Sequence, residues 1–249
     1  MARISMIGAG NLATHLSLAL QAGGHDIVQL FSRTAKTAAP LAQKLNCPFT
    51  TNLIELEQSD LAIIAVSDDV ISEVASQITL PMVHTSGTKG MEVLNQNDLH
   101  GVLYPLQTFS KSKEVNFQNI PICVEASNKE FEKILVEIAK SVSKKVSLLN
   151  SEQRKHLHLS AVMACNFSNL MYTLADEICQ AHEIPFELLK PLIEETAHKM
   201  QSIAPTDAQT GPASRKDLLT IERHLSHLNT DLEKKEIYQI LTESILKRS

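Results

Sequence analysis

The chain has 249 residues, of which 43% are hydrophobic and 20% are charged, a balance that excludes a disordered chain, a collagen-like fibre and a coiled-coil rod. Its 23 Lys and Arg residues against 28 Asp and Glu residues give a net charge of −5, so no large positive field is available to bind nucleic acid. No run of about 18 uncharged hydrophobic residues occurs, which excludes a membrane-spanning helix.

The N-terminus and the cysteines predict a location in the cytoplasm. Residues 1–7 lead directly into a glycine turn, without the basic start, hydrophobic run and cleavage site of a secretory signal. Cys47, Cys123, Cys165 and Cys179 are far apart and form no C-x-x-C pair, which argues against disulfides and a structural zinc site. We therefore expect a cytoplasmic protein with reduced thiols and no bound metal.

Residues 1–150 alternate short hydrophobic runs with longer amphipathic stretches, which is typical of strands joined by crossover helices. The predicted strands are Arg3–Ile7, Asp26–Phe31, Leu61–Val66, Met82–Thr85, Gly101–Leu103, Pro121–Val124 and Lys145–Leu148. The predicted helices are Asn11–Ala22, Ala35–Leu45, Val70–Gln77 and Lys129–Val142, with Ser127 or Asn128 as the N-cap of the last. This half is predicted to be a doubly wound, mostly parallel sheet of the α/β class.

After Asn150 the pattern changes to long helical periods without strands. Helices are expected over Glu152–His182, Phe186–Ser202, Arg215–Leu228 and Asp231–Lys247, with Ser151 as the first N-cap. We therefore predict two domains, a sheet domain over residues 1–150 and a smaller helical domain over residues 151–249. Four helices in about 100 residues bury few side chains, so we expect packing on a neighbour and predict a homodimer.

A glycine turn joins the first strand to the first helix. It reads Gly8-Ala9-Gly10-Asn11-Leu12-Ala13, the form G-x-G-x-x-A, in which the first glycine permits a tight turn and the second lets the backbone approach a pyrophosphate. The small third residue lets helix and strand pack closely, and the free N–H groups of the helix face the phosphates. The turn therefore predicts a dinucleotide site; the alternative is a purely structural turn.

The end of the second strand indicates which dinucleotide is bound. Sites for NAD usually place an acidic residue there, about 20 residues after the glycines, to bind the ribose 2′-hydroxyl. This chain has Ser32, Arg33 and Thr34 instead, followed by Lys36. A guanidinium group flanked by hydroxyls suits a 2′-phosphate, so we predict NADP, the alternative being a solvent-exposed Arg33.

Polar residues also follow the next strands of the predicted sheet, where ligands bind beyond the carboxyl ends. Val66 ends the third predicted strand and Ser67 and Asp68 follow it, and Asp68 or Asp69 is a candidate cap for the helix after it. Thr85 and Ser86 end the fourth, beside His84, which is either a cleft residue or a core histidine. Gln107 and Thr108 are candidate hydrogen-bonding groups near the nicotinamide.

These features together resemble Rossmann-type NADP-dependent oxidoreductases with an uncharacterised helical C-terminal domain, relatives of pyrroline-5-carboxylate reductase and ketopantoate reductase. The resemblance covers nearly the whole chain and rests on the glycine turn, on His84-Thr85-Ser86-Gly87, on Pro105-Leu106-Gln107-Thr108-Phe109, on residues 158–166, and on Thr210-Gly211-Pro212 followed by Arg215 and Asp217. That family often has His in place of Tyr104 and Gly in place of Lys216. The resemblance implies a Rossmann fold and NADP-dependent reduction.

Reduction of a carbonyl requires a proton donor near the reacting atom, which the first domain, the helical domain or a neighbouring subunit can supply, and the helical domain carries several candidates. The candidates are His158 as general acid, Asn166 as a ligand of a carboxylate or carbonyl, Lys155, and Arg215 as a ligand of an acidic substrate. Each also has a structural interpretation: a half-buried histidine, an interhelical hydrogen bond, a solvated lysine, and an ion pair of Arg215 with Asp217 or Glu222.

The leading hypothesis is an NADPH-dependent dehydrogenase that reduces a small acidic 2-keto compound. Ketopantoate, a precursor of pantothenate, is the named substrate because some chains of this general kind are thought to act as alternative ketopantoate reductases. An imine reductase of the pyrroline-5-carboxylate reductase type is the second hypothesis. A non-catalytic NADP-binding sensor is the third, because a glycine turn reports binding and not turnover.

Overall fold

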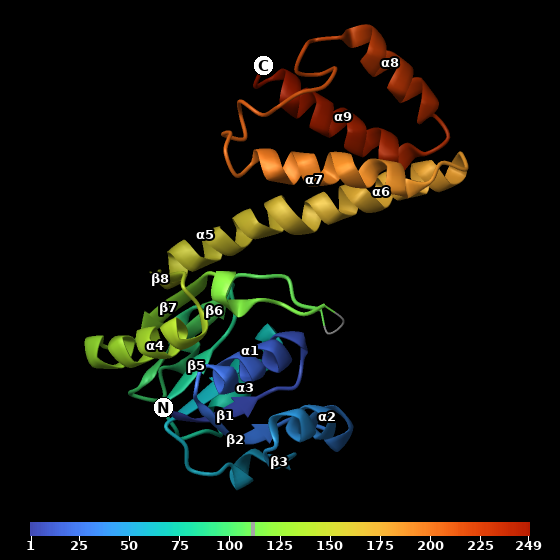
Figure 1. The fold of residues 1–249 in the computed structure, drawn as a ribbon. Coiled ribbons are helices and arrows are strands. Elements are labelled where there is room, and N and C mark those ends of the chain that lie inside the picture. Colours follow the sequence, from blue (N-terminus) through green and yellow to red (C-terminus); the bar gives the residue numbers. More distant parts are fainter. Residues whose placement is uncertain (111–112) are drawn as a thin grey trace. The chain divides into compact units, whose positions relative to one another are not determined.

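The computed structural model describes residues 1–110 and 113–249, and the chain divides into two compact units, Met1–Met163 and Ala164–Ser249. Figure 1 shows a unit built around a sheet and a unit built from helices. The helix α5 (Ser151–Ala161) belongs to the first unit, so this division lies after α5, whereas the predicted domain boundary lies before it.

The first unit is built on a sheet whose described strands run in the order β3-β2-β1-β4-β5-β6-β7-β8. The strands are β1 Arg3–Ile7, β2 Asp26–Phe31, β3 Phe49–Thr50, β4 Leu61–Ile64, β5 Met82–His84, β6 His100–Pro105, β7 Ile122–Ala126 and β8 Val146–Leu148. All neighbouring pairs are parallel except β6 and β7. The prediction of a mostly parallel α/β sheet is confirmed, and β3, with only two residues, is the strand that the sequence pattern missed.

Helices cover both faces of this sheet (Figure 1). They are α1 Asn11–Ala22, α2 Ala35–Leu45, α3 Ile71–Ala75 and α4 Lys129–Val142. Alternate residues of β4 belong to two separate hydrophobic clusters, Leu61 and Ile63 to the one with α1, α2 and α4, and Ala62 and Ile64 to the one with α3. A strand buried on both sides needs hydrophobic residues at every position, which is why the strands lack polar alternation.

The helix starts differ in detail from the prediction. Asn128 caps α4 by accepting from the N–H of Phe131, as one of the two predicted options has it. The predicted cap of α5, Ser151, is wrong, because Asn150 and Gln153 form a reciprocal capping box there. This box leaves the hydroxyl of Ser151 free for another bond.

A wider turn interrupts the long helix that the sequence predicts over residues 152–182. The segment Val162–Asn166 is a π-helix, and α6 (Phe167–Ala181) follows it directly. The second unit continues with the 3₁₀ turn Phe186–Leu189 and with α7 Lys190–Lys199, α8 Leu218–His227 and α9 Leu232–Leu246. None of the described helices is both long and hydrophobic enough to span a bilayer.

Candidate cofactor and catalytic site

A cavity of about 870 Å³ opens beyond the carboxyl ends of β1, β2 and β4 in the first unit. Nine of the predicted cofactor-binding residues line it: Gly8, Gly10, Asn11, Leu12, Ser32, Arg33, Thr34, Val66 and Ser67. Its volume falls in the range of about 300 to 1,000 Å³ that is usual for ligand sites. The strand ends therefore bring these residues together at one place, as parallel strands of this topology require.

Glycine stands at the two positions of the turn for different structural reasons. Gly8 has a φ of +121°, and a Cβ there would lie 2.2 Å from the carbonyl oxygen of Ala65, so no other residue fits. A Cβ at Gly10 would meet open space, which leaves that side of the backbone free for a ligand. Ala13 is fully buried and lies in the packing between α1 and the sheet, which is the role predicted for a small third residue.

Two helix starts that flank the cavity fit an anionic ligand. Among the described residues no side chain caps α1 or α2, and neither helix has an acidic residue in its first turn. The first backbone N–H groups of a helix have no intrahelical acceptor and carry a partial positive charge. The side chain of Asn11 is engaged elsewhere, because its amide donates to the carbonyl oxygen of Phe109 over 3.0 Å. The backbone N–H of Asn11, and not its side chain, is therefore free to donate to a phosphate.

A cluster of hydroxyls stands at the start of α2. The hydroxyl of Thr37 lies 2.7 Å from that of Ser32 and 2.9 Å from that of Thr34. Arg33 and Lys36 are exposed beside this cluster. Two cations, three hydroxyls and an uncapped helix start form a suitable environment for a phosphate monoester.

Asp68 does not have the predicted role of helix cap, and neither does Asp69. No side chain of the described residues caps α3, and the hydroxyl of Thr88 instead donates to the carboxylate of Asp68. This bond joins the segment after β4, where Ser67 lines the cavity, to the loop after β5. The cavity wall and that loop are therefore held together.

The loop after β5 is fixed from inside by His84. The Nδ1 atom of His84 accepts from the N–H of Ser86 over 3.1 Å, and its Nε2 atom lies 3.2 Å from the carbonyl oxygen of Gly90. Only a neutral imidazole protonated at Nε2 can make both bonds. Burial, and then the charge of Arg154, lower the pKa of His84 to about 4. His84 is thus a buried histidine that shapes the loop, which is one of its two predicted interpretations.

Thr85 and Ser86 also shape this loop and do not line the cavity. The hydroxyl of Thr85 donates to the carbonyl oxygen of Ile64 over 3.3 Å. The hydroxyl oxygen of Ser86 accepts from the N–H groups of Thr88 and Lys89 over 3.1 and 3.0 Å. Their predicted contact with the cofactor stays a prediction.

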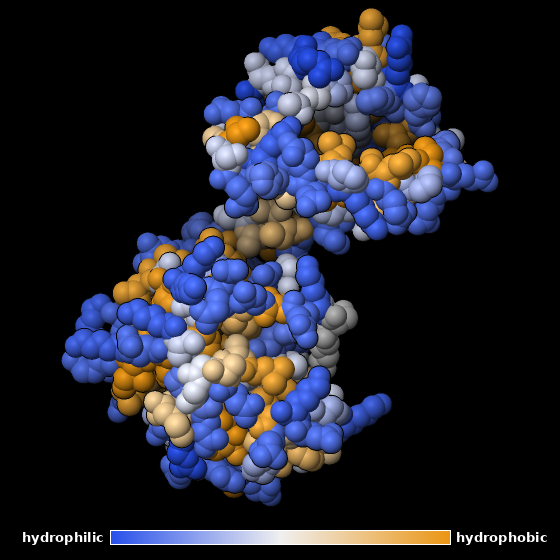
Figure 2. Space-filling view, viewed as in Figure 1, coloured by the Kyte–Doolittle hydropathy of each residue, from blue (hydrophilic) through white to orange (hydrophobic). Residues whose placement is uncertain are grey.

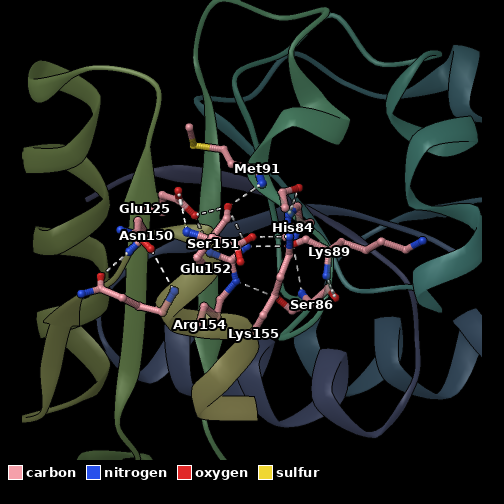
Figure 3. A network of polar contacts seen from close by, with 12 residues as sticks. His84, Ser86, Lys89, Met91, Glu125, Asn150, Ser151, Glu152, Arg154 and Lys155 are labelled. Atoms are coloured by element: carbon pink, nitrogen blue, oxygen red, sulfur yellow. Dashed lines mark hydrogen bonds and ion pairs between the residues drawn. The ribbon is translucent and has the colours of Figure 1, made fainter. Parts of the chain in front are cut away.

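The same loop is fixed from outside by a buried arginine that the sequence does not single out (Figure 3). Arg154 of α5 is fully buried, and it donates to the carbonyl oxygens of Ser86 over 3.2 Å and of Lys89 over 2.5 Å. Its charge is balanced by an ion pair with Glu125 of β7. Ser151 completes the network, because its N–H and hydroxyl donate to the same carboxylate over 2.9 and 2.8 Å.

His158 lies one helical turn after Arg154 and contacts the same loop. Its Nδ1 atom lies 3.0 Å from the hydroxyl of Tyr104, which stands near the carboxyl end of β6. A Cβ at Gly87 would lie 2.6 Å from Nδ1 of His158 and 2.9 Å from Cζ of Tyr104. The pair therefore sits directly on the backbone of Gly87. Burial raises the pKa of Tyr104 to about 12, so its hydroxyl keeps its proton.

The other predicted catalytic residues lie outside this cluster. Lys155 is half-exposed on α5 and pairs with Glu152 over 2.7 Å. Asn166 is exposed at the end of the π-helix. Arg215 is exposed in the second unit and makes no ion pair with a described residue, while Asp217 caps α8 by accepting from the N–H of Thr220. Among the described residues, none of these three shares a hydrogen bond with the Tyr104–His158 pair.

Lys216, which stands where the resembling family often has Gly, has a φ of +57°. This is the left-handed region that favours glycine, although this chain has a lysine there. Within residues 1–110 and 113–249, no three His, Cys, Asp or Glu side chains gather as metal ligands would.

Two family models match consecutive parts of this chain. Residues 120–245 match the family model described as "Domain of unknown function (DUF2520)", and residues 3–85 match the model described as "NADP oxidoreductase coenzyme F420-dependent". A Bacteroides fragilis protein named "putative NADP oxidoreductase" is 43% identical, with a TM-score of 0.92 over 99% of this chain and 98% of that one. No protein among the curated ones matches the sequence.

More distant structures share the fold. The 1-pyrroline-5-carboxylate reductase of Streptococcus pyogenes is 13% identical, with a TM-score of 0.66 over 99% of this chain and 98% of that one. An imine reductase of Myxococcus stipitatus, solved in complex with NADP+, is 16% identical, with a TM-score of 0.66 over 98% of this chain and 92% of that one. At these identities the likeness concerns the fold alone.

Proposed function

This chain belongs to the family that carries the DUF2520 domain, behind an N-terminal domain of the NADP oxidoreductase type, and from that membership we propose that it is an NADPH-dependent reductase of a carbon–nitrogen double bond. The observation that carries the proposal is the cavity beyond β1, β2 and β4, with the glycine turn on one side and Arg33 on the other. The cofactor supplies the hydride when it is bound.

The residues present fit NADP. The open backbone at Gly10 and the uncapped start of α1 suit a pyrophosphate. Arg33 and the hydroxyls of Ser32, Thr34 and Thr37 suit the 2′-phosphate that distinguishes NADP from NAD. With the adenosine half held at β2, the nicotinamide half would extend toward β5 and β6, because a dinucleotide spans both halves of such a sheet.

The choice of a carbon–nitrogen double bond is supported by the proteins that this chain resembles along its whole length. Both a pyrroline-5-carboxylate reductase and an imine reductase share its fold over 98% or more of this chain. A Rossmann domain followed by helices of this arrangement therefore accommodates imine substrates in those proteins. The same chemistry is the simplest assignment for this one.

A second candidate is the reduction of an acidic 2-keto compound such as ketopantoate. The hydroxyl of Tyr104 bonded to His158 would suit a carbonyl oxygen, which gains negative charge during hydride transfer, as well as an imine nitrogen, so the observation that favours this candidate is Arg215. Arg215 is exposed and without an ionic partner among the described residues, as a ligand for a substrate carboxylate has to be.

The test is the loss of NADPH absorbance with purified full-length protein. Pyrroline-5-carboxylate, a cyclic imine without a carboxylate, and ketopantoate are offered separately, each with NADPH and with NADH. We expect oxidation of NADPH with an imine and slower oxidation of NADH. Turnover with ketopantoate alone would establish the second candidate. Tight binding of NADPH without turnover of any substrate would contradict both candidates and leave a sensor.

A further inference from the structure

We infer that Tyr104 and His158 form a proton-donating site, in which the hydroxyl of Tyr104 protonates the substrate nitrogen and His158 resupplies that hydroxyl. This inference rests on the proposed function and names the residues that complete its reaction. It starts from the bond between the two side chains, 3.0 Å between the Tyr104 hydroxyl and Nδ1 of His158.

The position of Tyr104 suits a donor. It stands near the carboxyl end of β6, beside the loop after β5, at the edge of the sheet where ligands bind in this topology. Its ring packs over Gly87, where any larger residue would displace it. His158 is the titratable group bonded to the phenol. Burial, and then Cys123 and Asp68, raise the pKa of the Tyr104 hydroxyl, and only Arg154 acts against them.

The position of His158 suits a proton carrier. Its Nδ1 atom faces Tyr104, while Nε2 has no hydrogen-bond partner among the described residues and the side chain is only half-buried. One ring nitrogen can therefore serve the phenol while the other exchanges protons with water.

The loop beneath the pair is built to stay in place. His84 holds it from inside through Ser86 and Gly90, and Arg154 holds it from outside through the carbonyl oxygens of Ser86 and Lys89. Because Arg154 and His158 are four residues apart on α5, they share a face of that helix. The network of Figure 3 thus fixes the backbone on which the pair rests.

The proposed step balances. A hydride adds to the imine carbon, the π electron pair of the double bond moves to nitrogen, and the nitrogen takes the proton of the Tyr104 hydroxyl. The phenolate oxygen takes a proton from Nδ1 of His158 while Nε2 of the same ring takes one from water, which leaves a neutral imidazole and hydroxide; exchange with water then returns the ring to the form protonated at Nδ1. NADPH is oxidised, the imine is reduced to an amine, and one proton is consumed.

A pair of substrates separates proton donation from positioning. A neutral cyclic imine, assayed at alkaline pH, needs a proton, whereas its N-methylated iminium salt carries a permanent charge and needs none. Tyr104→Phe removes only the hydroxyl. We expect it to slow reduction of the neutral imine by about 10²- to 10⁴-fold, with NADPH affinity and reduction of the iminium salt unchanged. His158→Gln should show the same selectivity with a smaller loss.

The second unit offers a matched control, because Tyr238 and His224 form a similar pair with 2.8 Å between the hydroxyl and Nδ1. Tyr238→Phe should leave both rates unchanged. A readout without any ligand is the ¹⁵N NMR signal of the His158 ring, which Tyr104→Phe should shift and Tyr238→Phe should not.

Three outcomes would overturn the inference. Equal loss with the neutral imine and the iminium salt would make Tyr104 a positioning residue. No loss with either substrate would remove the pair from the reaction. If the wild type reduces neither substrate, the proposed function itself fails and the inference falls with it, which is distinct from failure of the variant alone.

Discussion

Residues 1–163 bury strands on both faces and hold a fully buried cation, Arg154, in an ion pair. In residues 164–249, all of which the structure describes, the buried hydrophobic residues are Cys179, Ala213 and Ile221 alone. The ion pair that joins α6 to α9 there, between Glu177 and Lys234, leaves the carboxylate half exposed.

Hydrophobic side chains remain on the surface of the helical unit, as the orange patches of Figure 2 illustrate. They include Leu170, Ile178, Leu188, Leu192, Leu218, Leu219, Leu232, Ile240 and Leu241. A sheet covered by helices on both sides buries both faces of its central strands, whereas a small set of helices buries one side of each helix. The same kind of substitution should therefore change the free energy of unfolding more in the first unit than in the second.

The largest expected effect is the loss of Arg154. Arg154→Met leaves Glu125 with no cation in a nearly buried position, and this should cost about 3–5 kcal/mol of unfolding free energy in urea titrations. Lys234→Met, the matched change in the ion pair whose carboxylate is half exposed, should cost less. Adding Glu125→Leu to Arg154→Met should recover stability. Equal losses for the two single variants would contradict the comparison.

The pH dependence of stability should come next. His84 is neutral in the fold with a pKa of about 4, against 6.5 when it is free, so the unfolded chain binds the extra proton as the pH falls. Stability should drop between pH 6.5 and about 4, by at most roughly 3 kcal/mol. His84→Gln, whose amide can donate to Gly90 and accept from Ser86, should flatten this part of the profile. An unchanged profile would show that other groups cause the drop.

Arg33→Ala tests the cofactor preference. It removes charged hydrogen bonds to the 2′-phosphate, worth about 1.5–3 kcal/mol, so NADPH affinity should fall roughly ten- to a hundredfold while NADH affinity barely changes. Fluorescence titration measures both. Lys44→Ala, at the far end of α2, removes the same charge and should affect neither cofactor. Equal weakening of NADPH and NADH would contradict the preference for NADP.

The smallest expected effect concerns the exposed hydrophobic surface. Leu192→Ser, at a side chain 63% exposed, should change the unfolding free energy of a monomer by no more than about 0.5 kcal/mol. Ile54→Ser, at 86% exposure in the first unit, is the matched control. The homodimer stays a prediction, and analytical ultracentrifugation tests it: a wild-type dimer that Leu192→Ser dissociates would show that a second copy covers this face.

The elements that the sequence predicted correctly are those marked by short patterns of neighbouring residues. The β1–α1 glycine turn, most helix ranges and the mostly parallel sheet follow from short patterns of hydrophobicity and turn residues. The π-helix at Val162–Asn166 leaves no such signal, because hydrophobic residues around it fit an ordinary helix equally well. From the sequence, Arg154 is indistinguishable from an ordinary surface charge on a helix, and only its burial in the structure shows that it holds the loop after β5.

By itself, the sequence determined the fold class, the dinucleotide turn, Arg33 at the end of β2 and nine of the residues that line the cavity, because each depends on neighbours a few residues apart. The tertiary structure decided the rest. It paired Tyr104 with His158 across 54 positions and Arg154 with Glu125 across 29. Such contacts depend on how strands and helices pack, and the physical reason is that burial and long-range hydrogen bonds leave no local pattern in the chain.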